Sequence, residues 1–212
     1  MRAIIVTGGN PPSKELLNRF INKDTDIIIG VDKGCEALYK YNIKPTFILG
    51  DFDSASKETV EYFANNKIKI ERFSPEKDYT DTHLGIKKAL EEGAKEILLF
   101  GATGTRIDHT LGNIGLMLMA KENNINIEII DDHNRAFLVN KQAVLKGKYG
   151  EVISFHALSS VVKNFTISGG KYDLEGYDMK FLEPRAICNE FLDGDINISF
   201  DSGVIMVIYP LD

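Results

Sequence analysis

The stretch ILGDFDSAS, at residues 48–56, places two carboxylates one residue apart. A run of apolar residues ends at Gly50, and Asp51, Asp53 and the hydroxyl of Ser54 follow it with no basic residue among them. Two acids in a tight turn at the end of a strand can hold a hard divalent cation such as Mg²⁺, which prefers carboxylate oxygens. They can equally form a solvated turn, since aspartate is common in turns. The pair alone leaves both interpretations open.

Three other turns carry residues of the same kind. Each follows an apolar run typical of a strand, and their sequences are VDKG, KDYTD and GATGTRIDH. In an open parallel sheet such turns lie on one edge, at the carboxyl ends of the strands, where ligands bind. We therefore expect the following residues to lie near one another: Asp32, Asp51, Asp53, Lys77, Asp78, Asp81, Gly101, Gly104, Arg106, Asp108 and His109.

Carboxylates crowded on one edge raise one another's pKa values unless a cation compensates their charge. Mg²⁺ takes one or two carboxylates, several waters and phosphate oxygens of a substrate. Lys77 and Arg106 would hold further phosphate charge, and the peptide N–H groups of GATG could line an anion site near a helix start. This is the chemistry of Mg²⁺-assisted phosphoryl transfer, in which the protein mainly positions groups and neutralises charge.

Each of these features also has an interpretation without a ligand. Asp81 and Asp108 are suitable N-caps for the helices predicted after them. Glycine after a strand usually makes only a turn, and the same holds for TGGNPP at residues 7–12. No P-loop of the form G-x-x-x-x-G-K-[ST] occurs in the sequence. The four turns together favour a binding edge, because capping alone does not explain all of them.

Short apolar runs alternate with helical patterns up to about residue 130. The runs are dense in Ile, Val, Leu and Phe, as in strands covered on both faces. This alternation indicates a mostly parallel sheet with right-handed crossovers. Gly93 is expected to end one helix. The predicted strands are residues 3–8, 26–31, 46–50, 68–73, 96–101 and 125–130, and the predicted helices follow Ser13, Asp32, Ser56, Asp81 and Asp108.

The helical period disappears after about residue 134. Strand-like segments follow, separated by the turns GKYG, SGG, LDGD and DSG. Short strands with turn signals between them predict a small antiparallel sandwich or barrel. The predicted fold is α/β: a Rossmann-like domain of residues 1–132, with a mostly parallel sheet flanked by helices, and an all-β domain of residues 133–212.

The composition limits the class of protein. With 25 basic and 31 acidic residues the net charge is −6, which argues against a nucleic-acid surface. No run of about 18 apolar residues occurs, so no membrane span is predicted, and the opening MRAIIVTGG does not have the composition of a signal peptide. The two cysteines, Cys35 and Cys188, lie far apart and form no C-x-x-C metal motif. A reduced, cytoplasmic setting is the expectation.

The ordered motifs resemble those of the thiamin pyrophosphokinase (thiamine diphosphokinase) family. VDKG, GDFDS, KDYTD and GATGTRIDH match the order and spacing of that family's motifs over residues 26 to about 115. GDFDS together with K-D-x-T-D is a highly specific combination. In the second half, SGGKYDLEG (168–176) and AICNEF (186–191) resemble the family's thiamin-binding β-domain more loosely. The resemblance covers nearly the whole chain.

The resemblance implies an enzyme that transfers the β,γ-diphosphate of ATP to the hydroxyethyl oxygen of thiamin, giving thiamin diphosphate and AMP. It also implies Mg²⁺ as cofactor, and by motif match the expected metal ligands are Asp51, Asp53 and Asp81. The other expected site residues are Asp78, beside the metal or the reacting hydroxyl; Asp32, as an organiser of the edge or a weak base; Lys77 and Arg106, on phosphates; and Gly101, Gly104, Asp108 and His109, lining the nucleotide and phosphate site.

The resemblance further implies where thiamin binds. The family commonly has a serine–asparagine pair, whose serine helps hold the thiamin pyrimidine, where this chain has Cys188 and Asn189. These two are the expected thiamin-binding residues, although a cysteine is a weaker hydrogen-bond partner than a serine. The family also implies a homodimer, in which the β-domain of one subunit completes the site of the other.

Two other functions are compatible with the acidic edge. One is a diphosphokinase acting on another acceptor, such as a hydroxymethyl pterin, which would keep the edge and change the acceptor pocket. The other is a nucleotide-binding sensor that binds ATP with Mg²⁺ without turnover. A sensor does not require so complete a set of acids, and this favours the enzyme.

Overall fold

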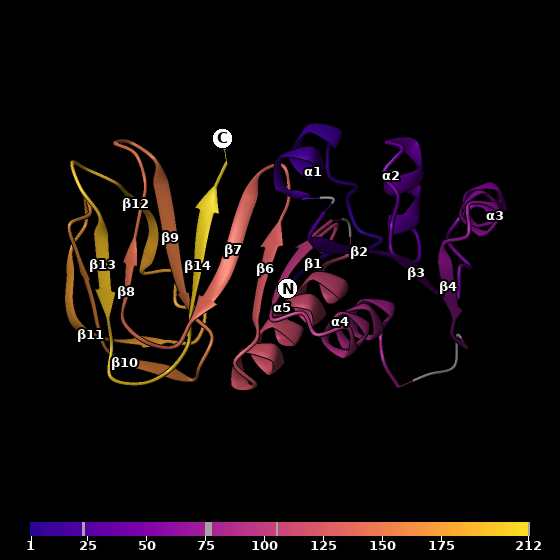
Figure 1. Ribbon diagram of the computed structural model, residues 1–212. Helices are drawn as coiled ribbons and strands as arrows, with labels where there is room; N and C mark the ends of the chain where they lie inside the picture. Colours follow the sequence, from indigo (N-terminus) through magenta and orange to yellow (C-terminus); the bar gives the residue numbers. More distant parts are fainter. Residues whose placement is uncertain (23, 75–77, 105, 212) are drawn as a thin grey trace. The chain divides into compact units, whose positions relative to one another are not determined.

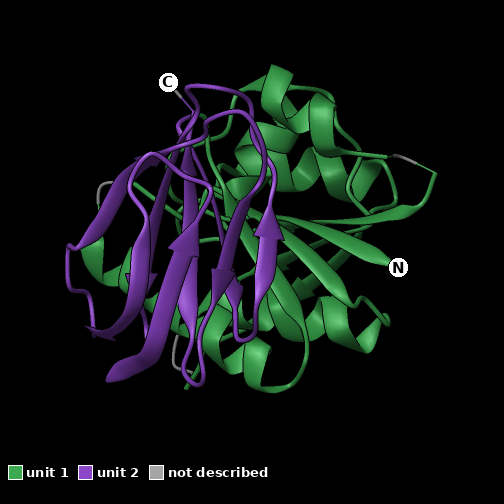
Figure 2. Cartoon of the chain, turned by 90° about the vertical axis from the view of Figure 1, so that its left-hand side faces the viewer, with its two compact units in different colours: residues 1–132 green, residues 133–212 purple. Residues whose placement is uncertain are grey.

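The computed structural model describes residues 1–22, 24–74, 78–104 and 106–211. The chain divides into two compact units, Met1–Asp132 and His133–Asp212, which Figure 2 colours separately. Each unit has its own hydrophobic core. Over the described ranges, no helix is long and apolar enough to cross a membrane.

Unit 1 contains a parallel sheet whose strands alternate with helices along the chain (Figure 1). Its strands pair in the order β6-β5-β1-β2-β3-β4, and every pair of neighbours is parallel. The carboxyl ends therefore share one edge, and the order reverses between β1 and β5. The elements are β1 (Arg2–Val6), α1 (Lys14–Phe20), β2 (Asp26–Val31), α2 (Gly34–Lys40), β3 (Phe47–Gly50), α3 (Lys57–Asn65), β4 (Lys69–Arg72), α4 (Asp81–Glu91), β5 (Glu96–Phe100), α5 (Ile107–Glu122) and β6 (Asn126–Ile130).

Helices cover both faces of this sheet, as the apolar strands predicted. In Figure 1, α1, α2 and α3 lie on one face, and α4 and α5 lie on the other. The core on the first face joins Ile4, Ile28 and Ile48 of the strands to Leu38 of α2 and Phe63 of α3. A strand buried on both faces has no polar side, which explains why these runs lack strict alternation. The expectation of a mixed α/β chain with a mostly parallel sheet is confirmed.

Two of the predicted helix caps are present. Ser13 and Ser56 are the N-caps of α1 and α3, and each hydroxyl accepts a hydrogen bond of 3.2 Å from the backbone N–H three residues later. Gly93 follows the end of α4 with a φ of +86°, a conformation that favours glycine. Local capping chemistry therefore fixes these boundaries as the sequence predicted.

Asp81 and Asp108 are not N-caps, and that interpretation of them was wrong. Thr80 caps α4, because it has extended backbone angles and its hydroxyl accepts a hydrogen bond from the N–H of His83. Arg106 precedes α5 and makes no side-chain cap. Both aspartates lie instead in the first turn of their helices, where the partial positive charge of the helix end favours an acid.

Unit 2 consists of two antiparallel sheets, with strand orders β12-β9-β14-β7 and β11-β10-β13-β8. Apolar side chains from both sheets form one core, with Phe155, Phe165 and Phe191 fully buried. The predicted antiparallel sheet is confirmed. The strands are β7 (Asn134–Val139), β8 (Ala143–Leu145), β9 (Val152–Ala157), β10 (Val161–Ser168), β11 (Leu174–Lys180), β12 (Ala186–Glu190), β13 (Ile196–Ser199) and β14 (Ile205–Pro210).

Candidate active site

A pocket of about 580 Å³ lies at the carboxyl edge of the parallel sheet. Its walls come from the loops that follow β1, β2, β3 and β5 and from the first turns of α4 and α5. This is the edge at which the sequence predicted a site, and the pocket includes the point where the strand order reverses. The lining residues are Thr7, Gly8, Gly9, Asp32, Lys33, Asp51, Asp53, Ser54, Tyr79, Thr80, Asp81, Thr82, Gly101, Ala102, Thr103, Gly104, Arg106, His109, Thr110 and Asn113.

Three carboxylates gather on one side of the pocket. Asp32, Asp51 and Asp53 each offer an oxygen, and these oxygens lie within 4.8 Å of one another. The neighbouring charge of Asp51 is the main cause that raises the pKa of the exposed Asp53 carboxyl, followed by desolvation and by Asp32. Asp81 contributes the same kind of repulsion more weakly. The sequence predicted Asp51, Asp53 and Asp81 as the metal ligands; the close group contains Asp32 as its third acid, and Asp81 lines the same pocket.

Unusual backbone angles bring these acids together. Asp32 has a φ of +46° and Phe52, between Asp51 and Asp53, has a φ of +59°. The Phe52 side chain is buried in the core of unit 1, so the two flanking carboxylates turn away from the core. The N–H of Asp53 donates to Asp51 Oδ1 at 3.0 Å, which tightens the turn. Left-handed angles are rare outside glycine, and here they direct acids into a pocket.

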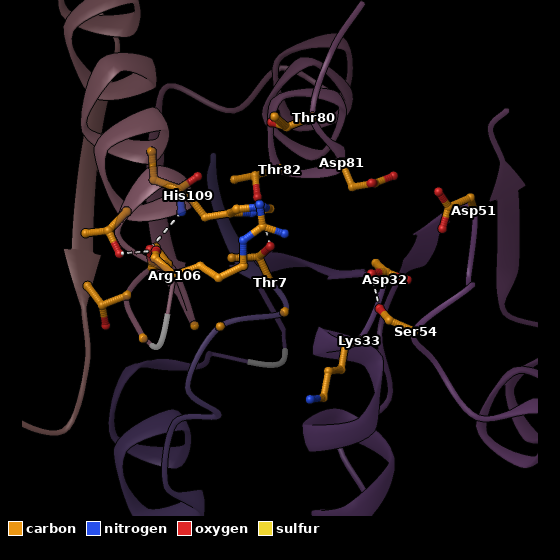
Figure 3. A pocket seen from close by; sticks show the side chains of 18 of the residues that line it. Thr7, Asp32, Lys33, Asp51, Ser54, Thr80, Asp81, Thr82, Arg106 and His109 are labelled. Atoms are coloured by element: carbon orange, nitrogen blue, oxygen red, sulfur yellow. Dashed lines mark hydrogen bonds between the residues drawn. The ribbon is translucent and has the colours of Figure 1, made fainter. Parts of the chain in front are cut away.

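The carboxyl group of Asp32 is held by one neighbour and is otherwise unsatisfied. The hydroxyl of Ser54 donates to Asp32 Oδ2 (Figure 3). Asp32 Oδ1 is buried and has no hydrogen-bond partner within the described residues. A buried carboxylate oxygen without a donor is costly unless a cation or a ligand satisfies it. Together with Asp51 and Asp53, it therefore fits a divalent cation.

Arg106 and His109 lie across the pocket from these acids (Figure 3). Arg106 forms a bidentate pair with Asp108, with distances of 3.2 Å from Nε to Oδ1 and 2.6 Å from Nη2 to Oδ2. The hydrogen bond from Arg106 is the main cause that lowers the pKa of Asp108 to about 2. Asp108 also accepts a hydrogen bond from the N–H of His109. Asp108 was expected to line the pocket, but it does not; it holds two residues that do.

The start of α4 brings a third group of residues to the pocket. Asp81 is the first residue of the helix, and its carboxylate points toward that of Asp51 (Figure 3). Thr82 is buried, and its hydroxyl lies 2.8 Å from that of Thr7 at the end of β1. Asp78 is exposed and does not line the pocket, contrary to expectation. Lys77, also expected here, lies outside the described residues.

Two glycine-containing loops form the floor of the pocket. The loop after β1 donates from Gly9 N–H to the carbonyl of Gly101 and from Asn10 N–H to the carbonyl of Thr103, both at 2.8 Å. A Cβ atom at Gly9 would lie 2.2 Å from the Thr103 oxygen, so only glycine allows this approach. Gly101 and Gly104 line the pocket as predicted, with φ values of +65° and +149°.

Several lining residues were not among the predicted site residues. Their common feature is position: most come from the loop after β1 or adjoin a predicted residue in the sequence. The TGG of residues 7–9 was interpreted as a simple turn, because the sequence does not reveal that β1 and β5 are neighbours. The residues that the prediction missed are Thr7, Gly8, Gly9, Lys33, Ser54, Tyr79, Thr80, Thr82, Ala102, Thr103, Thr110 and Asn113.

Cys188 and Asn189, the residues expected to bind thiamin, lie in β12 of unit 2. Cys188 is exposed with a φ of +58°, and its N–H donates to Ser154 Oγ at 3.0 Å. Asn189 is buried, and its amide binds the backbone of Tyr172 through both Oδ1 and Nδ2, at 3.0 and 2.8 Å. Asn189 therefore holds the bend that carries Tyr172, between β10 and β11, and Cys188 presents its thiol to solvent.

Comparisons with known proteins identify the family. A model of the thiamin pyrophosphokinase catalytic domain matches residues 19–129, and a model of the vitamin B1 binding domain of thiamin pyrophosphokinase matches residues 139–205. Thiamine pyrophosphokinase of Bacillus subtilis (strain 168) is 32% identical over 217 residues, which cover the whole of both chains. The chain belongs to the thiamin pyrophosphokinase family.

Solved structures of thiamin pyrophosphokinases share the fold of this chain. Thiamine pyrophosphokinase from Bacillus subtilis superposes with a TM-score of 0.89 at 30% identity, covering 100% of both chains. Thiamin pyrophosphokinase from Geobacillus thermodenitrificans gives a TM-score of 0.86 at 30% identity, covering 100% of this chain and 98% of that one. The predicted family and enzyme class are confirmed, and these matches favour neither a pterin diphosphokinase nor a sensor.

Proposed function

We propose that this thiamin pyrophosphokinase family member transfers the β,γ-diphosphate of ATP as one unit to the hydroxyethyl oxygen of thiamin. The products are thiamin diphosphate and AMP. The observation that carries the proposal is the pocket itself, which gathers three carboxylates opposite Arg106 over two glycine loops. Acids on one side suit a cation, and an arginine beside glycine-containing loops on the other suits phosphate.

Mg²⁺ is the proposed cofactor, held by Asp51 and Asp53 with Asp32 or Asp81, directly or through water. Its ligands of choice are hard oxygens, which all four residues supply. When bound, the metal supplies charge neutralisation to the transferring phosphates and to the leaving AMP. Two observations support this assignment: the pKa of Asp53 is raised, and Asp32 Oδ1 has no hydrogen-bond partner in the described residues. Both are expected of a site whose negative charge is not compensated.

ATP is the proposed donor, bound at the reversal of strand order between β1 and β5, as nucleotides are in Rossmann-like sheets. Arg106 and His109 line the nucleotide side of the pocket, with Gly101 and Gly104 beneath them. The Nε and Nη2 edge of Arg106 binds Asp108, so the Nη1 end of the guanidinium is the part proposed to bind phosphate oxygens. Asp108 keeps this guanidinium oriented through its bidentate contact. Lys77 remains a proposed phosphate ligand from the sequence.

The reaction needs little proton transfer early on if its transition state is loose. The task of the chain is then to hold the thiamin hydroxyl in line with the β-phosphorus and to keep the charges compensated. Where Asp81 completes the metal site, Asp32 is left to take the hydroxyl proton late, because its Oδ1 has no hydrogen-bond partner in the described part of the chain. Ser54 keeps the other oxygen of that carboxylate engaged.

Unit 2 is the proposed thiamin-binding and dimerisation domain. Cys188 would contact the thiamin pyrimidine in the place of the family's serine, and Asn189 would hold the neighbouring backbone. We propose a homodimer in which unit 2 of one subunit completes the pocket of the other, and a cytoplasmic location. The match of residues 139–205 to the vitamin B1 binding domain supports the assignment of thiamin to this unit.

Product identity tests the proposed reaction. The purified protein is incubated with ATP, Mg²⁺ and thiamin, and the nucleotides and thiamin esters are separated. AMP formed one-for-one with thiamin diphosphate is the expected result. ADP formed with thiamin monophosphate would show ordinary γ-phosphoryl transfer and would refute the proposal. ATP binding without turnover would point to another acceptor, and then to a sensor.

An Asp81→Asn variant tests the acidic edge separately. We expect turnover to be lost while folding changes little, since the side chain contributes to α4 mainly through the helix dipole, about 0.3–1 kcal/mol. Asp24→Asn is the matched control, because Asp24 is an exposed acid that does not line the pocket. Unchanged turnover in Asp81→Asn would mean that this acid serves only the first turn of α4.

A further inference from the structure

The glycine loop, which we define as residues 101–104, is held through its carbonyl groups. Gly101 C=O accepts from Gly9 N–H, and Thr103 C=O accepts from Asn10 N–H. Between them, Ala102 C=O accepts from the side-chain amide of Asn113, with 2.7 Å between Nδ2 and the oxygen. Three successive carbonyls of the loop therefore each point toward a donor of their own.

This arrangement fixes the direction of the peptide N–H groups. All described peptide bonds are trans, so the C=O and the following N–H of one peptide unit point in opposite directions. The N–H groups of Ala102, Thr103 and Gly104 therefore each point away from the donor that holds the preceding carbonyl. Peptide N–H groups in a loop of this kind can form an anion site. All four residues of the loop line the pocket, together with the donors Gly9 and Asn113.

Asn113 is the only one of the three donors that is a side chain. It lies in α5, is buried with 7% of its surface exposed, and lines the pocket. The other two bonds join backbone to backbone, between neighbouring loops of the sheet edge. Without the amide, the peptide between Ala102 and Thr103 has no partner for its carbonyl, and glycines on either side with positive φ give it freedom to rotate.

A second side-chain contact holds the same loop from the outside. The hydroxyl of Thr103 donates to Asp131 Oδ2 at 2.7 Å, and Asp131 directly follows β6. The loop is thus attached to α5 on one side and to the end of β6 on the other. Two side-chain contacts on four residues exceed what a simple turn requires, and neither contact uses a peptide N–H group of the loop.

We propose that Asn113 is a positioning residue for phosphate binding: its amide sets the peptide of Ala102 and Thr103 so that the loop N–H groups bind a phosphate of the nucleotide. It acts through the loop and does not itself react. The inference rests on the proposed function for the identity of the nucleotide. The chemistry it requires is more general, namely a polyphosphate anion at this floor of the pocket.

The test compares Asn113→Ala with a control on the same helix. Asn123, which ends α5, also donates from Nδ2 to a backbone carbonyl, that of Met119 at 2.9 Å, but away from the pocket. Asn123→Ala thus removes the same kind of hydrogen bond without touching the glycine loop. Inorganic diphosphate and ATP are titrated into each protein in a calorimeter, and KM is measured for ATP and for thiamin.

We expect Asn113→Ala to weaken binding of both diphosphate and ATP roughly 10- to 100-fold, the effect of one or two lost hydrogen bonds to a charged group. KM for ATP should rise, and KM for thiamin should stay within about threefold, because a loop that holds phosphate does not contact the acceptor. Asn123→Ala should leave all these values unchanged. Equal diphosphate affinity in folded Asn113→Ala and wild type would overturn the inference.

Folding and function are separated by two further measurements. Circular dichroism and thermal unfolding report whether Asn113→Ala is folded. If it is not, Asn113→Leu keeps a branched side chain in this buried position, removes the amide donor and adds no charge, and the same loss is expected. Diphosphate binding needs no turnover, so it tests the loop even where wild type makes no thiamin diphosphate. Wild type that does not bind diphosphate overturns the inference as well.

Discussion

A Gly9→Ala substitution should damage the pocket without touching any charged residue. Gly9 brings the loop after β1 against the glycine loop, where its N–H and that of Asn10 bind the carbonyls of Gly101 and Thr103. An added Cβ would lie 2.2 Å from the Thr103 oxygen and 2.4 Å from the Gly101 oxygen. Both are backbone atoms, which cannot move aside as a flexible side chain can.

The size of the effect follows from these distances. The loops must separate by roughly 1 Å before the new methyl group reaches ordinary packing distance. Two hydrogen bonds would be stretched or lost, each worth about 0.5–1.5 kcal/mol, so we expect a loss of about 1–3 kcal/mol in the free energy of unfolding. A displacement of this size in the loop proposed to bind phosphate should lower kcat/KM for ATP about 100-fold.

Urea unfolding and steady-state kinetics measure the two effects, and Gly115→Ala is the control. A Cβ at Gly115 meets no atom within 4 Å, so alanine there should stabilise α5 by about 1 kcal/mol through helix propensity and leave kinetics unchanged. Full activity of Gly9→Ala with unchanged stability would refute the argument that the contact between these two loops shapes the pocket.

Two further variants test the acids and unit 2. Without metal, repulsion raises the pKa of Asp53, so the folded protein loses stability as the pH rises above that carboxyl's ordinary pKa of 3.8. Asp53→Asn should therefore raise the melting temperature of the metal-free protein at neutral pH and reduce the stabilisation by Mg²⁺. A lower melting temperature of this variant would contradict the reasoning. Asn189→Ala removes the hydrogen-bond partner of three backbone groups: the N–H of Tyr172, the N–H of Glu190 and the carbonyl of Tyr172. Urea unfolding should therefore show a free energy of unfolding lower by about 2–4 kcal/mol. A decrease below about 1 kcal/mol would contradict the role assigned to the Asn189 amide.

The fold was largely predictable because its signals are local. The apolar run at residues 26–31 coincides with β2, and the serines at 13 and 56 cap the helices that follow them. Runs buried on both faces and hydroxyl caps act over a few residues, which a sequence displays directly. Strand order is not local, and for that reason the loop after β1 was not expected beside the loop after β5.

The site was predictable as an edge of the sheet but not residue by residue. Asp32 replaces Asp81 in the close group of acids because its left-handed backbone directs the carboxylate toward Asp51, and no residue type announces such an angle. Asp108 and His109 are adjacent in α5, where successive side chains point about 100° apart. His109 lines the pocket, and the Asp108 side chain instead binds Arg106.

The charge distribution of the pocket implies that metal and nucleotide bind cooperatively in the proposed reaction. Asp51 and Asp32 already raise the pKa of Asp53, so a polyphosphate entering alone would add repulsion to a site with too much negative charge. A cation bound first removes that repulsion, and the phosphate oxygens then complete its shell. Because linkage is reciprocal, the nucleotide must tighten metal binding by the same factor. Arg106 alone does not compensate the excess negative charge, since its guanidinium already pairs with Asp108. The chain can therefore carry a net charge of −6 and still be suited to an anionic substrate.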